Sequence, residues 1–260
     1  MRALDIAATG MEAQNLRVET ISNNLANMNT TAYAPRRAEF ADLHYQQVRQ
    51  PGTINASDGT ILPTGVQLGL GVRAAAVSME PGGGSLRQTG GELDIAIQGR
   101  GWLEIELPNG ESAWTRDGGL KRSADGQLVT VEGFPVIPDI TIPEDANSVS
   151  INADGEVVAN FTGQPSEVLG RLTLGAFVNE KGLQAIGGNL FTETAASGPP
   201  DVGDAGVDGR GTFRQGFLEE SGVDPVREIT ELIEAQRGYE MNAKVITAAD
   251  QMLGATVQIR

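Results

Sequence analysis

The two ends of this chain of 260 residues carry the same hydrophobic spacing, and this spacing constrains the fold more than any other feature. Between residues 4 and 28, mostly apolar side chains recur at alternating intervals of three and four, and residues 229–257 repeat the pattern. The polar exceptions are Gln14, Gln236 and Asp250. A three-four repeat puts one side chain per turn on a narrow stripe, which is typical of a helix that packs against another helix. We therefore predict two terminal helices that pair with each other or with helices of neighbouring copies.

The large apolar side chains on these stripes are the expected subunit-packing residues. They are Leu4, Met11, Val18, Ile21, Leu25, Ile229, Leu232, Tyr239, Ile246 and Leu253. An ordinary helical hairpin inside one molecule is the competing interpretation of the same spacing. Assembly is favoured because a large β-rich insert separates two narrow stripes. On this hypothesis, the polar positions Gln14, Gln236 and Asp250 set the register of the helices.

The middle of the chain has the alternation of β-strands. Period-two runs occupy residues 93–97, 103–107 and 172–177, and tight-turn pairs stand at Asn109-Gly110, Asp125-Gly126 and Asp154-Gly155. Such pairs tolerate the positive φ angles of short hairpins. The predicted fold class is α+β, with long terminal helices forming a coiled-coil-like region and a mainly antiparallel β middle. The expected divisions are 1–30 (N-terminal helix), 31–71 (extended or loop linker), 72–216 (one or two β-rich domains) and 217–260 (C-terminal helix).

Local signals mark the ends of these elements. Asp224 can cap the last helix and Pro225 suits its first position, where a missing N–H costs nothing. Gly238 and Gly254 weaken that helix by about 1 kcal/mol each relative to Ala, so it needs a packing partner. Residues 46–71, rich in Gly and Pro, are expected to be extended or a long ordered loop, and residues 195–212 a surface loop.

Charge and composition exclude several functions. A net charge of -15 argues against nucleic acid or an anionic membrane surface as a partner, because both reward clustered Lys and Arg. Residues 1–30 and 224–260 together carry only -3, so the acidity lies in the β-rich middle. The absence of cysteine removes disulfides and thiolate chemistry. The N-terminal residues do not have the pattern of a cleaved secretory signal, and no apolar run is long enough for membrane insertion.

Candidate chemistry is sparse. His44 is the only histidine, so neither a triad nor a multi-histidine metal site is available without help from carboxylates. Asp201, Asp204 and Asp208 lie in a Gly-rich stretch, but Thr212 stands where an EF-hand loop starting at Asp201 needs a glutamate. The carboxylates of Glu104, Glu106 and Glu111 fit a solvated strand face better than an acid and base pair. We expect no catalytic residue, metal site or cofactor.

Two motifs resemble the signatures of bacterial flagellar rod and hook proteins, a family of axial structural proteins. The first, within residues 21–33, contributes Asn23, Asn24, Leu25, Ala26, Asn27, Asn29 and Thr30. The second, within residues 221–253, contributes Gln236, Arg237, Tyr239, Glu240 and Asn242. Shorter matches, such as Thr115-Arg116-Asp117-Gly118, extend the resemblance along the whole chain, most closely to members that build the distal part of the rod. Ala32 and Ala34 replace the family's usual Gly and Lys ahead of Pro35, which predicts a more rigid helix exit.

The resemblance implies a structural subunit without enzymatic activity. It would polymerise into a rigid hollow drive shaft, with the terminal helices forming an inner tube and the β domains outside. Implied partners are further copies of the chain, proximal rod proteins, hook or hook-junction proteins, the surrounding P-ring and L-ring proteins, and the flagellar export apparatus. The implied location is the basal body, in the rod that crosses the periplasm, reached by type III export without signal cleavage. Residues 46–71 resemble a rod-specific segment that stiffens contacts between subunits.

Two alternatives stay open at this level. A hook or proximal rod subunit is the nearer one, and a curved polymer after deletion of residues 46–71 would favour the distal rod instead. A secreted β-rich binding module or hydrolase with helical dimerisation ends is the more distant one. It requires a pocket with convergent polar groups, for which the sequence offers no candidate.

Overall fold

The computed structural model describes residues 2–50 and 64–258, and its contacts divide the chain into two units. The helical unit comprises Met1–Ala26, Arg36–Ser78 and Asp224–Arg260. The β unit comprises Asn27–Pro35 and Met79–Val223. Two helices and many antiparallel strands confirm the α+β class. The predicted rod-specific segment, residues 46–71, lies partly outside the described residues.

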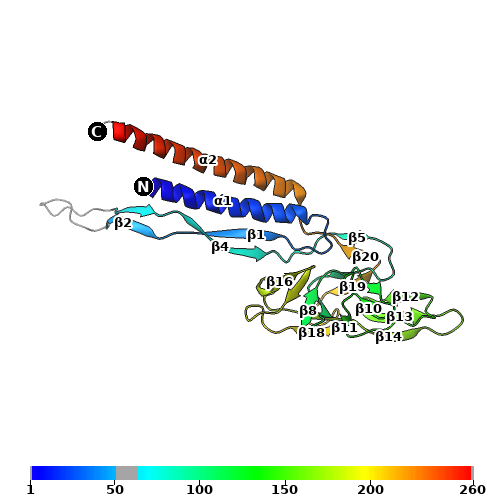
Figure 1. Ribbon diagram of the computed structural model, residues 1–260. Helices are drawn as coiled ribbons and strands as arrows, with labels where there is room; N and C mark the ends of the chain where they lie inside the picture. Colours follow the sequence, from blue (N-terminus) through cyan, green and yellow to red (C-terminus); the bar gives the residue numbers. More distant parts are fainter. Residues whose placement is uncertain (1, 51–63, 259–260) are drawn as a thin grey trace. The chain divides into compact units, whose positions relative to one another are not determined.

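The two helices dominate the helical unit. Helices α1 (Arg2–Ala26) and α2 (Pro225–Gln258) lie side by side and run in opposite directions (Figure 1). The predicted start of α2 is confirmed, because Oδ1 of Asp224 accepts hydrogen bonds from the N–H groups of Val226 at 3.0 Å and Arg227 at 3.4 Å. Pro225 occupies the first helical position, as expected. A capped start of this kind stabilises a helix by about 1 kcal/mol.

A β ribbon covers the side of α1 that faces away from α2 (Figure 1). Strand β1 (Arg36–Asp42) pairs with β4 (Val72–Met79), and β2 (Tyr45–Arg49) pairs with β3 (Val66–Gly69). The Thr9 hydroxyl ties the ribbon to α1, since it accepts the Val72 N–H at 3.3 Å and donates to the Ile6 carbonyl. Helix α1 is therefore held on two sides.

The β unit is built from short strands joined by tight turns. Its strands are β5 (Leu86–Gln88), β6 (Ile95–Gln98), β7 (Leu103–Glu106), β8 (Ser112–Thr115), β9 (Lys121–Arg122), β10 (Leu128–Val129), β11 (Val136–Ile137), β12 (Ser148–Ile151), β13 (Glu156–Asn160), β14 (Glu167–Arg171), β15 (Thr173–Ala176), β16 (Gln184–Gly187), β17 (Leu190–Thr192), β18 (Asp201–Asp204), β19 (Thr212–Gln215) and β20 (Phe217–Glu219), with a 3₁₀ turn at Glu180–Gly182. The largest sheet has the order β11-β7-β8-β17-β16. A three-stranded sheet, β12-β13-β14, and the antiparallel pairs β10-β9, β15-β18, β19-β6 and β20-β5 complete the unit.

All three predicted tight turns form hairpins. Gly110 joins β7 to β8, Gly126 joins β9 to β10, and Gly155 joins β12 to β13, each with φ between +79° and +87°. Side chains with a Cβ rarely adopt such angles, so glycine at these positions determines where the chain reverses. One expectation is wrong. Residues 195–212 are not wholly a loop, because β18 lies within them and pairs with β15.

Two clusters of buried side chains form the core of the β unit. The larger cluster packs aliphatic residues such as Ile95, Leu103 and Leu172 from several sheets. The smaller cluster is aromatic: Trp102 meets Phe191 edge-on at 4.9 Å, and Trp114 meets Phe177 at 5.2 Å. Edge-to-face pairs of this kind add about 0.5–1.5 kcal/mol each beyond their burial. Both tryptophans of the chain lie here, so tryptophan fluorescence reports on this unit.

Ala32 is held in a strained backbone conformation. Its φ is +53° and it is buried, and its N–H donates to the Glu219 carbonyl at 2.9 Å. A left-handed conformation costs a residue with a Cβ about 1–2 kcal/mol, which fits the glycine that the resemblance leads us to expect at this position. The departure noted in the sequence therefore has a structural cost.

We expect Ala32→Gly to raise the stability of the β unit. The expected gain is roughly 0.5–1 kcal/mol, because relief of the strain exceeds the entropy that glycine adds to the unfolded chain. Urea unfolding followed by tryptophan fluorescence measures it. Ala34→Gly is the matched control, since Ala34 packs against the aromatic cluster and is not among the positive-φ residues. A loss of stability in both variants would contradict the strain argument.

Candidate assembly site

The contact between α1 and α2 runs through small residues. At Gly10 a Cβ would lie 2.8 Å from Nδ2 of Asn242, and at Gly238 it would lie 3.1 Å from Cδ of Gln14. Ala235 and Ala249 of α2 are fully buried. Small side chains let two helix backbones approach closely, so this contact is tighter than one made by large apolar residues.

The predicted packing residues are spread between buried and exposed positions. Ile21 is buried; Leu4, Met11, Val18, Leu25, Leu232, Ile246 and Leu253 are half-buried; Ile229 and Tyr239 are exposed. The predicted register positions also differ, because Gln14 lies against Gly238 whereas Gln236 and Asp250 are exposed. The prediction from the spacing of large side chains did not include the alanines and glycines of the contact between α1 and α2. The sequence does contain a signal for this contact. Small or short side chains follow each other on α2 at intervals of three, four and seven, at Ala235, Gly238, Asn242 and Ala249.

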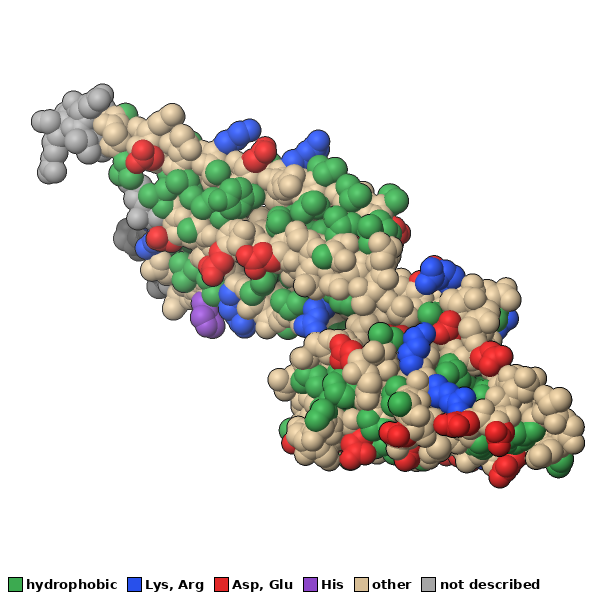
Figure 2. Space-filling model, turned by 45° about the vertical axis from the view of Figure 1, so that its right-hand side comes forward, with side chains coloured by type: hydrophobic (Ala, Val, Ile, Leu, Met, Phe, Trp, Pro, Cys, Tyr) green, Lys and Arg blue, Asp and Glu red, His purple; other side chains and the backbone are tan. Residues whose placement is uncertain are grey.

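Helix α2 carries a second apolar face. Val226, Ile229, Ile233 and Met241 lie on the side of the helix opposite Ala235 and are 46–75% exposed. Figure 2 shows hydrophobic side chains gathered over the helical unit. Several large apolar side chains exposed on one helix face mark an interaction surface rather than a solvated one.

Ion pairs flank the helix contact. Arg17 lies 3.4 Å from Glu231 and 3.5 Å from Glu234, and Arg227 lies 3.1 Å from Glu231. Burial would raise the pKa of Glu231, but hydrogen bonds from Arg227 and Arg17 lower it overall. Because the folded-state pKa is depressed, the contribution of Glu231 to stability is present above its ordinary pKa. That contribution is lost as the pH falls through the folded value.

Asn24 of the first signature connects three elements of the helical unit. Its Nδ2 donates to the Arg36 carbonyl at 2.8 Å, and its Oδ1 accepts the Arg36 N–H at 2.9 Å. The same Nδ2 donates to Oε1 of Glu228 at 3.2 Å. The side chain is 2% exposed, so these bonds are shielded from water. Asn24 thereby joins the end of α1 to the start of β1 and the first turn of α2.

The remaining signature residues have more varied positions. Asn23, Ala26 and Asn29 are exposed, whereas Asn27 and Thr30 form a turn in the β unit through the 3.1 Å hydrogen bond from the Thr30 hydroxyl to Oδ1 of Asn27. In α2, Asn242 lies against Gly10 of α1. Gln236, Arg237, Tyr239 and Glu240 are exposed on α2.

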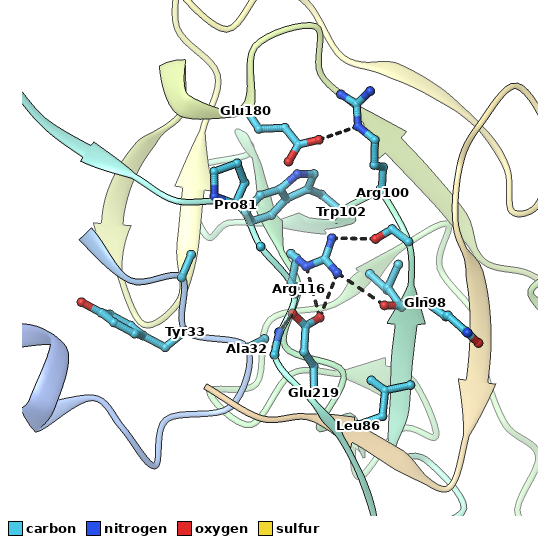
Figure 3. A pocket seen from close by; sticks show the side chains of 16 residues that line it. Ala32, Tyr33, Pro81, Leu86, Gln98, Arg100, Trp102, Arg116, Glu180 and Glu219 are labelled. Carbon is cyan, nitrogen blue, oxygen red and sulfur yellow. Dashed lines mark hydrogen bonds and ion pairs between the residues drawn. The ribbon is translucent and has the colours of Figure 1, made fainter. Parts of the chain in front are cut away.

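A buried ion pair closes one side of a cavity of about 420 Å³ in the β unit (Figure 3). Nε and Nη2 of Arg116 lie 3.2 and 2.9 Å from Oε2 of Glu219. Its nitrogens also donate to the carbonyls of Gly99, Gly101 and Ile97. The two side chains are 11% and 5% exposed. With its donors so engaged, Arg116 holds β20 against the turn between β6 and β7.

The motif around Arg116 is explained by neighbouring contacts. A Cβ at Gly118 would overlap the carbonyl oxygen of Ile95, so only glycine fits there. Burial raises the pKa of Asp117, and the negative charge of the nearby Asp94 raises it further. A hydrogen bond from the Gly119 N–H acts in the opposite direction, but the pKa is raised overall. Because the folded state favours the neutral carboxyl, Asp117 costs stability as the pH rises through its folded pKa.

Several carboxylates that the sequence raised as candidate ligands are paired with arginines. Arg210 lies 2.9 Å from Asp201 and 3.5 Å from Asp208, and Arg171 lies 3.0 Å from Asp204. Each of the three aspartates thus has an arginine partner. Within residues 2–50 and 64–258, no three His, Cys, Asp or Glu side chains are grouped as a metal site. In the same part of the chain, no helix has the length and apolar character needed to cross a membrane.

Comparisons with known proteins agree with both signatures. The family model "Flagella basal body rod protein" matches residues 4–33, "Flagellar hook protein FlgE/F/G D1 domain" matches residues 96–159, and "Flagellar basal body rod FlgEFG protein C-terminal" matches residues 214–259. The flagellar basal-body rod protein FlgG of Caulobacter vibrioides is 51% identical over 100% of both chains. The FlgG proteins of Agrobacterium fabrum (50%, 97% of each chain) and Bacillus subtilis (34%, 100% of this chain and 99% of the relative) are also similar. The chain therefore belongs to the flagellar basal-body rod protein family, and it is a structural subunit of the flagellar distal rod.

Proposed function

We propose that copies of this chain polymerise through their terminal helices into a rigid, hollow shaft that transmits torque from the motor to the hook and forms part of the export channel. The exposed apolar face of α2 carries this proposal. Burying each large apolar side chain contributes about 1.5–3 kcal/mol, and the contribution repeats with every subunit. A protein that acts alone has no use for such a face. In this mechanism function arises from packing, not from catalysis.

In the proposed shaft, residues 1–30 and 217–260 form the inner helical wall, with coiled-coil-like contacts between subunits. Residues 72–216 form the outer casing, residues 31–71 link the two, and the rod-specific segment within the linker, residues 46–71, stiffens subunit contacts. The ten packing residues predicted from the sequence belong to this inner wall. The half-buried ones, among them Leu4, Met11 and Leu253, have surface left to bury against neighbours.

The proposed partners follow from the basal-body location. The shaft joins proximal rod proteins at one end and hook or hook-junction proteins at the other, and the P-ring and L-ring proteins surround it where it crosses the periplasm. The export apparatus delivers the subunit without signal cleavage, and no nucleic acid, membrane insertion or cofactor is involved. The acidic β-rich middle would give the shaft an acidic exterior, which limits adhesion to the rings.

We expect Ile233→Glu or Met241→Glu to weaken tube formation while the monomer stays folded. Each places a charge where an apolar side chain would be buried between subunits, which should raise the critical concentration at least about tenfold. Electron microscopy and sedimentation of the concentrated protein measure this. Val168→Glu, at an exposed apolar position of the β unit, is the matched control and should leave assembly unchanged. Discrete particles from the unaltered chain, instead of straight tubes, would overturn the proposed function.

A further inference from the structure

A groove opens along the side of α1 in the helical unit. It encloses about 540 Å³ between α1, the turn after β1 and the start of β4. Apolar side chains line it, among them Ala13 and Leu16 from α1, Leu43, and Val72 from β4. Its α1 rim carries the carboxylates of Glu12 and Glu19. An apolar groove with an acidic rim fits an amphipathic helix that carries basic residues.

The acidic rim has a defined spacing. Glu12 and Glu19 are separated by seven residues, or about two helical turns, so their side chains point the same way about 10 Å apart. Both are exposed. Glu19 accepts a hydrogen bond from Nδ2 of Asn15 at 2.8 Å, and neither carboxylate forms an ion pair with another described residue. The rim thus offers two negative charges at a fixed interval.

The exposed face of α2 has the matching pattern. Arg237 and Lys244 are also separated by seven residues, and they lie on the same side of the helix as Ile233 and Met241. Both basic side chains are exposed, and among the described residues neither forms an ion pair. Glu240 lies on the edge of this face, where it can supply a carboxylate for Arg73 on the other wall of the groove. The exposed face of α2 therefore matches the groove in three respects: it carries apolar side chains, its basic residues are opposite in charge to the acidic rim, and the two basic residues have the same spacing as Glu12 and Glu19.

We propose that the outer face of α2 in one copy docks into the α1–β4 groove of the next copy, with Arg237 opposite Glu19 and Lys244 opposite Glu12. The antiparallel order follows if all copies of a polar polymer point the same way, because α1 and α2 are antiparallel within each copy. This contact joins two different surfaces of the chain. Such a contact gives a closed ring if the rotation between successive copies closes, and otherwise a helical filament or tube. This inference rests on the proposed function and names the subunit contact that it uses.

Two charge-reversal variants test this contact. The groove variant is Glu12→Lys with Glu19→Lys, and the helix variant is Arg237→Glu with Lys244→Glu. Alone, each variant places like charges across the contact, so we expect its critical concentration for assembly to rise at least about tenfold. In an equimolar mixture every groove can meet a helix of opposite charge, and assembly should recover towards that of the unaltered chain. Sedimentation and electron microscopy at low ionic strength are the measurements.

The controls separate folding and net charge from docking. Far-UV circular dichroism and tryptophan fluorescence should show that both variants fold as monomers. Asp125→Lys with Asp145→Lys changes the net charge as much as the groove variant does but lies on exposed positions of the β unit, and it should assemble normally. A mixture that assembles no better than the separate variants, while the unaltered chain forms tubes, would overturn this contact and leave the proposed function intact. An unaltered chain that forms no tubes would overturn both.

Discussion

Replacing Glu219 with glutamine should destabilise the β unit by about 3–5 kcal/mol, because it leaves the Arg116 guanidinium buried without a compensating charge. The carbonyls of Gly99, Gly101 and Ile97 still accept hydrogen bonds from Arg116, but three dipoles do not replace a carboxylate 2.9 Å away. Arg116→Met should cost at least as much, since it also leaves those carbonyls without their donor. The free energy of unfolding, measured with urea and tryptophan fluorescence, gives the value.

Glu220→Gln is the matched control for this prediction. Glu220 is the next residue and also pairs with an arginine, but its pair with Arg87 spans 3.8 Å between side chains that are 46% and 62% exposed. Exposed pairs contribute about 0–1 kcal/mol, so this variant should remain close to the unaltered chain. Equal losses in the Glu219 and Glu220 variants would mean that burial does not strengthen the Arg116 pair. The Arg116 interaction would then be no more than a surface contact.

Replacing Asn24 with alanine should destabilise the helical unit by about 2–4 kcal/mol. The variant loses the hydrogen bonds to the Arg36 carbonyl, the Arg36 N–H and Glu228, and it leaves the Arg36 backbone groups with fewer partners. Because α1, β1 and α2 meet at this side chain, the helices should melt at a lower temperature while the tryptophan signal of the β unit hardly changes. Far-UV circular dichroism and fluorescence on the same sample separate the two effects.

Two further variants sharpen the role of Asn24. Asn24→Asp keeps an acceptor for the Arg36 N–H but sets a carboxylate beside Glu228 and beside the Arg36 carbonyl, so its stability should improve as the pH is lowered and the carboxyl is protonated. Asn23→Ala, at an exposed neighbouring asparagine, should have a much smaller effect. If the Asn23 and Asn24 variants lost the same stability, the signature asparagines would not differ in role. The hydrogen bonds by which Asn24 joins α1, β1 and α2 would then add nothing measurable to the stability of the helical unit.

Features encoded in adjacent residues were predictable from the sequence. Asp224-Pro225 marked the start of α2, since a capping side chain and a proline act within one helical turn. The glycines of three hairpins marked chain reversals, since positive φ is a property of the residue itself. The alternating runs became β6, β7 and β15 for the same local reason. Strand β18 was missed because its Asp and Gly residues lack strand propensity, and pairing with β15 overrides that preference.

The candidate site was less predictable, because its contacts join distant parts of the chain. The three-four spacing located both helices but could not tell which face of each helix meets the other. The large apolar residues predicted one face of each helix. In the structure the two helices meet through a different face, where Gly10, Gly238 and Ala235 allow the backbones to approach closely. Nothing local connects Arg116 with Glu219, which lies 103 residues away. The groove beside α1 arises only when β4 packs near the helix.

By itself, the sequence determined that this protein has two terminal helices around an antiparallel β middle, where those helices and hairpins begin, and to which family it belongs. These properties follow from backbone preferences and periodicity, which act over a few residues. Only the tertiary structure decided that small residues join α1 to α2, that an apolar face of α2 stays exposed, and that a groove with an acidic rim lies beside α1. Those outcomes depend on which surfaces pack together. The packing is decided by the free energy of the whole molecule, to which residues far apart in the sequence contribute.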